Sequence, residues 1–564
     1  MDKLPIEVLH RIFCLLSLSQ RIKCTLVCRL WWRTLDTRSL LYDINIDSEF
    51  RYSLFKDMIE RLPYRSTQVE DITLKYCLDY DYDKRKICNM FPNARKICLI
   101  NEIGVGVRDF SNKRFHCINS KPRLEELTEY GACELTSFMI SMNLSANIRK
   151  LELELGETVR KRDNNIIHQL KNMPFLEKLK LQNFVYVIED FERLHEKITS
   201  IKELELVRIR IHTIDMPAII KPASSITGLS LSVIDLDGDS CSTWLQYLAK
   251  KYDHLNQLSI NDFDTEELDA EYIATTLKED LIRLLQVNAF YLQTLSWNNL
   301  PFHLTIPEEL DSIECKLENL DLRSNKNTTS EFENLALSNQ SKYIKNLSLT
   351  NIKLNRIDLL NKMEKLTSLS LTCELKDGYG SDSFSNSDSD DEDSGEKMMM
   401  INLSDTLEAC LPTLTAFSIK NFDFKFRYST HHPTSITSLY IECSTIRKKL
   451  TDIISTCFPK LTSLQIYGNI LDDLSINLVN HKLLDVSFSP SQNKRAYNLS
   501  VENTNKCEPS FYIPKHNSFY VNLPGLEKDA LVPVPYDELD GRPVLTLICN
   551  SIQRLKLNSC PVKL

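Results

Sequence analysis

The feature that most constrains this chain is a short motif, apolar-x-x-Leu-x-Leu, which recurs along most of its 564 residues. In an extended strand, alternate side chains point to opposite faces, so the two Leu of each motif lie on one face and stack on those of the next copy. Such a series predicts one strand and one return segment for each copy. Sixteen segments follow the motif, with another apolar residue replacing a Leu in some: 69–74, 94–99, 148–153, 176–181, 201–206, 226–231, 255–260, 292–297, 317–322, 344–349, 366–371, 414–419, 436–441, 461–466, 483–488 and 552–557.

The motif and its interval of about 22 to 30 residues resemble the leucine-rich repeat. The resemblance implies an α/β repeat solenoid, a curved horseshoe with strands along its concave face. Some return segments have a helical pattern. Residues 265–288 are one example, since their charged and apolar residues follow the helical period. The apolar residues of this segment are expected to point inward: Leu268, Ile273, Leu277, Leu281, Leu284 and Leu285.

The x positions of each motif point away from the core, so they are candidates for binding a protein substrate. Charges alternate in sign between two neighbouring copies, and two aromatic residues fall on the same face of two later copies. The candidate substrate-binding residues are Lys178, Lys180, Glu203, Glu205, Tyr440 and Tyr467. The alternative for each position is an ordinary solvated strand residue.

Three segments interrupt the regular spacing of the repeats. Residues 46–68 join the N-terminal part to the first copy and are expected to hold a short helix near residues 55–62. Residues 375–401 include an acidic stretch, 377–396, that has eight acidic and no basic residues, and its composition predicts disorder. Residues 489–550 are rich in Pro, Asn and aromatic residues, which indicates irregular repeats or an inserted loop.

The N-terminal forty residues have a different pattern, with apolar residues at helical spacing in two clusters. So short a piece buries too little surface to stand alone, and it needs a partner or a neighbouring domain. The two clusters are Leu4-Pro5-x-Glu7-Val8-Leu9-x-x-Ile12-Phe13-x-x-Leu16 and Leu26-Val27-Cys28-Arg29-x-Trp31.

These clusters resemble the two halves of an F-box. The resemblance implies three helices that dock on a Skp-type adaptor, which in turn binds a cullin. The implied adaptor-binding residues are Leu4, Pro5, Leu9, Ile12, Phe13, Val27 and Trp31. The alternative is an N-terminal cap that buries the same residues on the first repeat.

The composition narrows the remaining function classes. A formal net charge of −9 argues against a nucleic-acid or anionic-membrane partner, and no apolar stretch reaches the length of a membrane span. The seventeen cysteines show no metal-site spacing and are expected to be reduced thiols of a cytoplasmic or nuclear protein. No nucleotide-binding, hydrolase or zinc-protease motif is present, so neither catalysis nor a cofactor is expected.

The sequence therefore predicts a substrate-recognition adaptor of an SCF-type ubiquitin ligase, a non-catalytic subunit that directs a protein to proteasomal degradation. The predicted domains are the F-box (1–45), a linker with a first helix (46–68), the repeats (69–488) with the insertion 375–401, and irregular C-terminal repeats with a cap (489–564). The alternative is a repeat scaffold without a link to ubiquitin, whose N-terminal helices are only a cap.

Overall fold

The computed structural model falls into two compact units, residues 1–292 and 293–564. It describes residues 5–14, 16, 18–36, 40–75, 90–100, 123–131, 133–155, 169–186, 188–211, 216–217, 219–236, 238–263, 278–298, 306–323, 330–351, 357–373, 400–402, 406, 413–425, 434–470, 473–489, 497–503, 518–522, 544–557 and 560–561.

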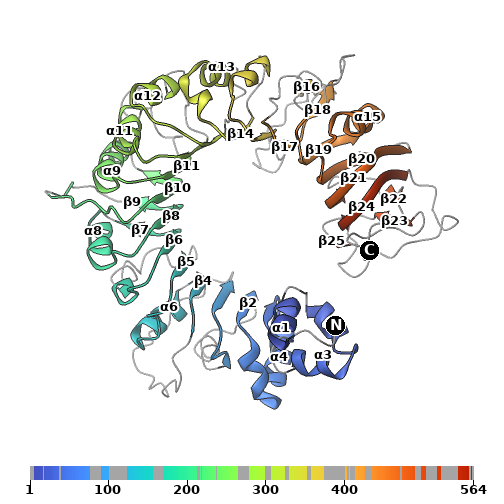
Figure 1. Cartoon of the computed structure of the whole chain (residues 1–564). Helices are drawn as coiled ribbons and strands as arrows, with labels where there is room; N and C mark the ends of the chain where they lie inside the picture. The colour runs from blue at the N-terminus through green and yellow to red at the C-terminus, as the bar shows by residue number, and fades with distance from the viewer. Residues whose placement is uncertain are drawn as a thin grey trace, which may run out of the picture. The chain divides into compact units, whose positions relative to one another are not determined.

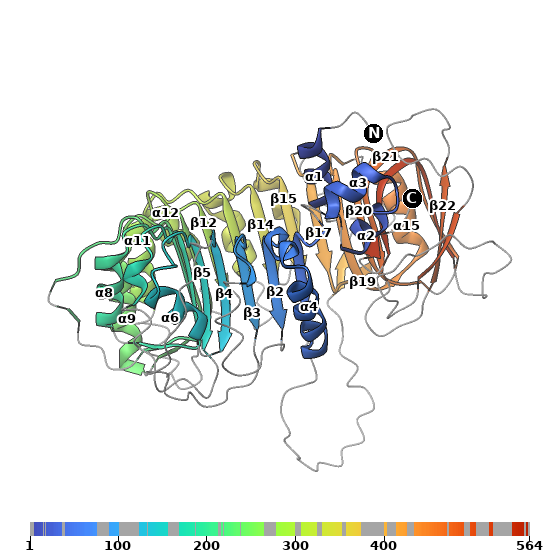
Figure 2. The same ribbon diagram turned by 90° about the horizontal axis from the view of Figure 1, so that it is seen from below.

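The first unit is built on a parallel sheet in which each strand pairs with the strand of the next copy (Figure 1). Figure 2 shows β2 to β5 lying side by side. In order along the sheet, the strands are β1 (Asp43–Ile46), β2 (Asp71–Lys75), β3 (Lys96–Ile100), β4 (Glu126–Gly131), β5 (Lys150–Leu155), β6 (Lys178–Gln182), β8 (Glu203–Val207), β10 (Gly228–Leu236) and β11 (Gln257–Phe263). Two short strands, β7 (Val185–Tyr186) and β9 (Arg210–Ile211), pair with each other, and β9 also pairs with β10.

The register of this sheet places the repeated Leu side chains in rows. Leu151 lies opposite Leu179, which lies opposite Leu204, and all three are at most 1% exposed. Between them, the x residues face the other side and stay half-buried or exposed. The rows of buried Leu form the core that one repeat cannot make by itself.

The return segments of the first unit form helices along one face of the sheet (Figure 1). Leu281, Leu284 and Leu285 are buried as predicted, whereas Leu268, Ile273 and Leu277 lie outside the described residues. The short helix expected before the first repeat is α4, and Ser48 caps it by accepting a hydrogen bond from Arg51 N. The helical segments are α4 (Glu49–Arg61), η2 (Pro63–Gln68), α6 (Glu134–Ser141), η3 (Leu170–Asn172), α8 (Ile188–Lys197), α9 (Gly238–Lys251) and α11 (Lys278–Asn288).

Two return helices, α8 and α9, are joined by a buried polar network. The Lys251 ammonium and the Tyr247 hydroxyl both donate to the Glu192 carboxylate, at 2.9 and 2.8 Å. His195 Nε2 lies 2.8 Å from the Tyr252 hydroxyl. Burial, together with the nearby Lys251 charge, lowers the pKa of His195 to about 3, so this imidazole is neutral at physiological pH.

The second unit continues the same construction. Parallel strands pair in the order β12 (Thr294–Asn298), β13 (Asn319–Arg323), β14 (Asn346–Thr350), β15 (Ser368–Thr372), β17 (Ala416–Lys420), β19 (Ser438–Ile446), β20 (Ser463–Ile470), β21 (Leu474–Ser489), β24 (Val544–Leu557) and β22 (Tyr497–Asn503). The helical segments are α12 (Ile306–Ser312), α13 (Ser330–Leu337), η5 (Asn339–Lys342), η6 (Ile357–Lys362) and α15 (Lys448–Cys457).

All sixteen sequence motifs lie at strands of these two sheets, which confirms a solenoid with one strand per repeat. Two strands in the parallel series of the first unit were missed. The first, β1, ends the segment assigned to the F-box, so the sheet begins before residue 69 and the predicted boundary at 45 cuts a strand. The second, β4, breaks the motif because Glu129 stands where the second Leu is expected.

Glu129 is only 1% exposed, and its carboxylate compensates for the missing Leu. It accepts hydrogen bonds from the backbone N–H of Leu135 and of Thr136, each at 2.9 Å, and from the Thr136 hydroxyl at 2.8 Å. These are first-turn groups of α6, whose N-cap residue Cys133 offers no side-chain cap. A buried carboxylate therefore satisfies the helix start and complements its dipole.

The irregular segments are described in part. Residues 375–399 lie outside the described residues, but Met400 and Ile401, predicted to end the disordered insertion, belong to β16 (Met400–Asn402), which pairs with β18 (Asp423–Lys425). Within 489–550, β22 pairs antiparallel with β23 (Ser518–Asn522) and parallel with β24. The chain's last described strand, β25 (Cys560–Pro561), pairs antiparallel with β24.

Candidate functional site

The N-terminal module consists of three short helices, α1 (Ile6–Cys14), α2 (Leu18–Cys24) and α3 (Arg29–Thr34), which pack around a small core. Leu9, Phe13 and Leu35 are at most 1% exposed and form this core. Trp31 is half-buried against it, with its ring edge-on to Phe13 at 5.3 Å. The module therefore has a small core of its own.

Several large apolar side chains of this module are exposed to solvent. Leu26 is 86% and Val27 59% exposed, although both are large apolar residues. A monomeric protein rarely leaves so many apolar side chains exposed within one short segment unless they meet a partner. We refer to the following residues as the apolar patch: Ile6, Val8, Ile12, Ile22, Leu26, Val27 and Trp32.

The predicted adaptor-binding residues divide between this patch and the core. Pro5, Ile12 and Val27 are exposed, and Trp31 is half-buried. Leu9 and Phe13 are buried in the core, where they hold α1 against α3, and direct contact of these residues with a partner stays a prediction. Leu4 lies outside the described residues. The helical stripe in the sequence could not separate the two groups, because a short helix in contact with its own core and with a partner is apolar on both sides.

Polar contacts attach the module to the first repeat. The fully buried Arg21 forms an ion pair with Asp43, the first residue of β1. Arg65 of η2 forms a second ion pair with Asp36, at 2.9 Å, and the Gln68 side chain donates to the Asp36 carbonyl. The module thus contacts the sheet while its apolar patch stays uncovered.

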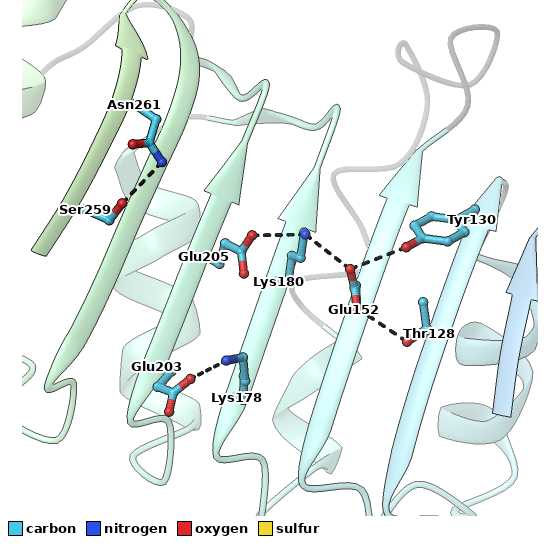
Figure 3. Close-up of polar contacts among 9 residues, drawn as sticks. All are labelled: Thr128, Tyr130, Glu152, Lys178, Lys180, Glu203, Glu205, Ser259 and Asn261. Atoms are coloured by element: carbon cyan, nitrogen blue, oxygen red, sulfur yellow. Dashed lines mark hydrogen bonds and ion pairs between the residues drawn. The ribbon is translucent and has the colours of Figure 1, made fainter. Parts of the chain in front are cut away.

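The predicted charged residues of the sheet face lie together, and they pair with one another (Figure 3). Lys180 bridges two carboxylates, Glu152 at 3.2 Å and Glu205 at 3.0 Å. Lys178 pairs with Glu203 on the adjacent strand. Burial lowers the pKa of Lys180, but its hydrogen bonds and attraction to Glu205 and Glu152 raise it by more.

The same network extends to the preceding strand. The Tyr130 hydroxyl donates to Glu152 at 3.4 Å, and burial together with this carboxylate raises the pKa of Tyr130 to about 12. Every charge in this network therefore has an opposite charge nearby. A substrate carboxylate that bound Lys180 would compete with two internal carboxylates, and one that bound Lys178 would compete with one.

The two predicted tyrosines of the second unit also lie together. Tyr440 on β19 and Tyr467 on β20 stack at 5.2 Å between ring centroids. Lys420 Nζ lies 5.0 Å from the centre of the Tyr440 ring, and the Tyr440 hydroxyl donates to Glu442 at 2.8 Å. Burial and the nearby Glu442 carboxylate raise the pKa of Tyr440 above its ordinary value. These rings are half-buried rather than fully exposed, so they present one stacked face.

Two other features are absent from the described parts of the chain. No group of three or more His, Cys, Asp or Glu side chains there is placed to hold a metal ion. Nor is any described helix both long and apolar enough to cross a membrane.

Comparisons with known proteins inform the N-terminal module only. No curated protein matches the chain. A solved structure titled "Crystal structure of TLR13-ssRNA13 complex" aligns with 75% of this chain and 57% of its own length, at 14% identity and a TM-score of 0.33, which is too low to support an argument. The chain spans little more than half of that protein's length. A family model described as F-box-like matches residues 1–47, so the similarity to that family covers the three-helix module and the first strand.

Proposed function

We propose that this protein is a substrate-recognition adaptor of an SCF-type ubiquitin ligase in the cytoplasm or nucleus. In this proposal, the N-terminal module binds a Skp-type adaptor and, through it, a cullin. The repeats bind a protein that is then ubiquitinated and degraded by the proteasome. The chain itself is a non-catalytic subunit. The observation that carries the proposal is the apolar patch on a module that matches the F-box-like family.

The energetics of the patch favour a protein partner. Complete burial of a Leu or Val side chain contributes about 1.5–3 kcal/mol. Leu26 and Val27 have most of that gain still available, since more than half of each side chain is exposed. The buried core of Leu9, Phe13 and Leu35 keeps the three helices in place before binding, which reduces the ordering cost.

The repeats fit the second half of the proposal. They form long parallel sheets whose outward side chains differ from strand to strand on a constant frame. Such a surface recognises extended regions of another protein. Because Lys178, Lys180, Glu203 and Glu205 are already paired with one another or with Glu152, recognition in this proposal depends on groups that keep free donors or exposed rings.

The proposal is tested with the substitutions Ile12→Asp and Val27→Asp combined, measured by calorimetric titration of the full chain with a purified Skp-type adaptor. Both side chains are at least 40% exposed, so the variant is expected to fold. A charge placed in a buried interface is costly, and we expect at least a hundredfold loss of affinity. The matched control is Leu337→Asp on α13, which is 63% exposed and should bind like the wild type. Wild-type binding that the double variant leaves unchanged would refute the proposal.

The second candidate is a repeat scaffold whose module is only a cap. The ion pair of buried Arg21 with Asp43 and the Arg65–Asp36 pair favour it, because they attach the module to the first repeat. A cap, however, would cover apolar surface, whereas the apolar patch is left exposed. The scaffold candidate predicts that the wild-type chain itself fails to bind any Skp-type adaptor in the same titration.

A further inference from the structure

A row of alternating charges runs along one edge of the first sheet. Each residue of the row directly precedes a strand, so the regular pairing of the sheet brings the row together. Opposite charges follow one another from strand to strand along it. The row consists of Glu70, Arg95, Glu125, Arg149, Glu177 and Lys202.

Most of this row is neutralised internally. Arg95 contacts Glu125 at 2.9 Å and Glu70 at 3.9 Å. Arg149 pairs at 3.3 Å with Glu177, which also contacts Lys202 at 3.7 Å. The hydrogen bond between Arg95 and Glu125 raises the pKa of the guanidinium and lowers that of the carboxyl, so both groups stay charged.

A cavity of about 490 Å³ opens beside this row, and its lining has an excess of positive charge. Three of its lining residues are arginines, Arg95, Arg123 and Arg149, and two are carboxylates, Glu70 and Glu125. Arg123 precedes β4 and is exposed, and no ion pair or hydrogen bond joins its side chain to another residue in the described part of the chain. Arg149 is 61% exposed and uses only one terminal nitrogen toward Glu177, so it keeps free donors.

The same cavity has an apolar wall. Phe175, in the loop before β6, is 58% exposed and lines the cavity together with Asn147. A planar guanidinium recognises carboxylate and phosphate groups with two parallel hydrogen bonds. An exposed aromatic ring beside such a group provides contact area for an apolar side chain at small entropy cost.

We propose that this cavity binds a peptide segment of a protein partner that carries an anionic side chain next to an apolar residue. Arg123 and Arg149 bind the anion, and Phe175 packs against the apolar neighbour. Carboxylate and phosphate share the required chemistry. The site lies at the edge of the sheet, and neither Lys178 nor Lys180 lines it. The interpretation of the cavity as a substrate-binding site rests on the proposed function. Peptide binding by the cavity does not require that the chain binds a Skp-type adaptor.

The test is the binding of the full chain to three oriented peptide libraries, with a central phosphoserine, glutamate or serine. We expect the two anionic libraries to bind at least tenfold more strongly than the serine library, with apolar residues enriched beside the centre. The ratio between phosphoserine and glutamate identifies the source of the anion. Arg123→Glu should abolish this preference, and Phe175→Ser should remove the apolar enrichment. Arg283→Glu, an exposed position on α11 with the same charge change, should behave like the wild type.

The outcomes separate this inference from the proposed function. Equal binding to all three libraries, or an anion preference that survives Arg123→Glu, would overturn the inference. The Arg123→Glu variant is expected to bind a Skp-type adaptor like the wild type, because the cavity and the apolar patch share no residue. If the chain shows the peptide preference but does not bind the adaptor, the peptide-binding inference is supported and the ligase role is contradicted.

Discussion

The buried carboxylate of Glu129 gives the sharpest test of how this fold accommodates a break in its motif. The repeat calls for an apolar residue at this position, yet Glu129→Leu should destabilise the start of α6. The substitution restores the motif but removes the acceptor for two backbone N–H groups and for the Thr136 hydroxyl.

The magnitude follows from those contacts. A hydrogen bond to a charged group contributes about 1.5–3 kcal/mol, and a buried donor left unpaired costs a similar amount. The Leu side chain recovers about 1.5–3 kcal/mol of apolar burial at most. The three bonds to the carboxylate contribute about 4.5–9 kcal/mol. The apolar burial of Leu, together with the desolvation cost of the carboxylate that the substitution removes, offsets part of this. The net loss is therefore about 2–4 kcal/mol, confined to β4 and α6. Glu129→Gln retains one acceptor oxygen and should lose roughly half as much.

Amide hydrogen exchange of residues 133–141, followed by mass spectrometry, measures this loss locally and needs no two-state unfolding of the whole chain. A loss of 2–4 kcal/mol corresponds to exchange that is about thirty to a thousand times faster. Glu126→Gln is the matched control on the same strand, since its side chain is 41% exposed and pairs only on the other face. Unchanged or slower exchange in Glu129→Leu would refute the capping role.

Three further predictions test other parts of the structure. The pKa of His195 is lowered from about 6.5 to about 3 on folding, so the unfolded state binds more protons between these two pH values. Stability should therefore fall by about 1.4 kcal/mol per pH unit as the pH drops through that window. In urea unfolding between pH 7 and 5, the stability of His195→Phe should depend less on pH than that of the wild type, and equal slopes would contradict this prediction. Asn421 has a left-handed backbone, φ 59°, so Asn421→Ala should cost about 1–2 kcal/mol and Asn421→Gly much less in the same unfolding assay, whereas equal losses would argue against strain. Lys180→Met should destabilise the protein more than Lys178→Met, because Lys180 is less exposed (24% against 41%) and pairs with two carboxylates rather than one. The reverse order in thermal unfolding would contradict this prediction.

The repeat fold could be predicted from the sequence because the motif determines which residues of each strand face the core. A one-residue shift would turn every Leu of a strand to the opposite face, so the alternation fixes both strand and orientation. The prediction failed at β4, where the buried position is occupied by a carboxylate that caps the start of α6, six to seven residues later, and an acidic residue breaks the apolar pattern on which the prediction rests. It also failed at β1, since Leu41, Ile44 and Ile46 follow the motif but lie within the segment read as the F-box.

The sites were predictable to a lesser degree. The pairing of Lys180 with Glu205 follows from alternating signs at equivalent positions, so aligned repeats contain that information. Which apolar residues of the module are exposed could not be read from spacing, because Leu9 and Ile12 share one short helix and only packing separates them. The cavity beside Arg123 combines residues that precede four strands with Phe175 in a loop, and no motif links them.

The most direct test of the central claim is affinity capture of the full chain from its own cells, compared with the Ile12→Asp and Val27→Asp double variant. The proposed ligase role predicts that the wild type recovers a Skp-type adaptor and a cullin, and that the double variant recovers neither while still retaining proteins bound by the repeats. If the wild type captures no adaptor or cullin, or if the double variant captures both equally well, the apolar patch is not the docking surface and the ligase role is contradicted.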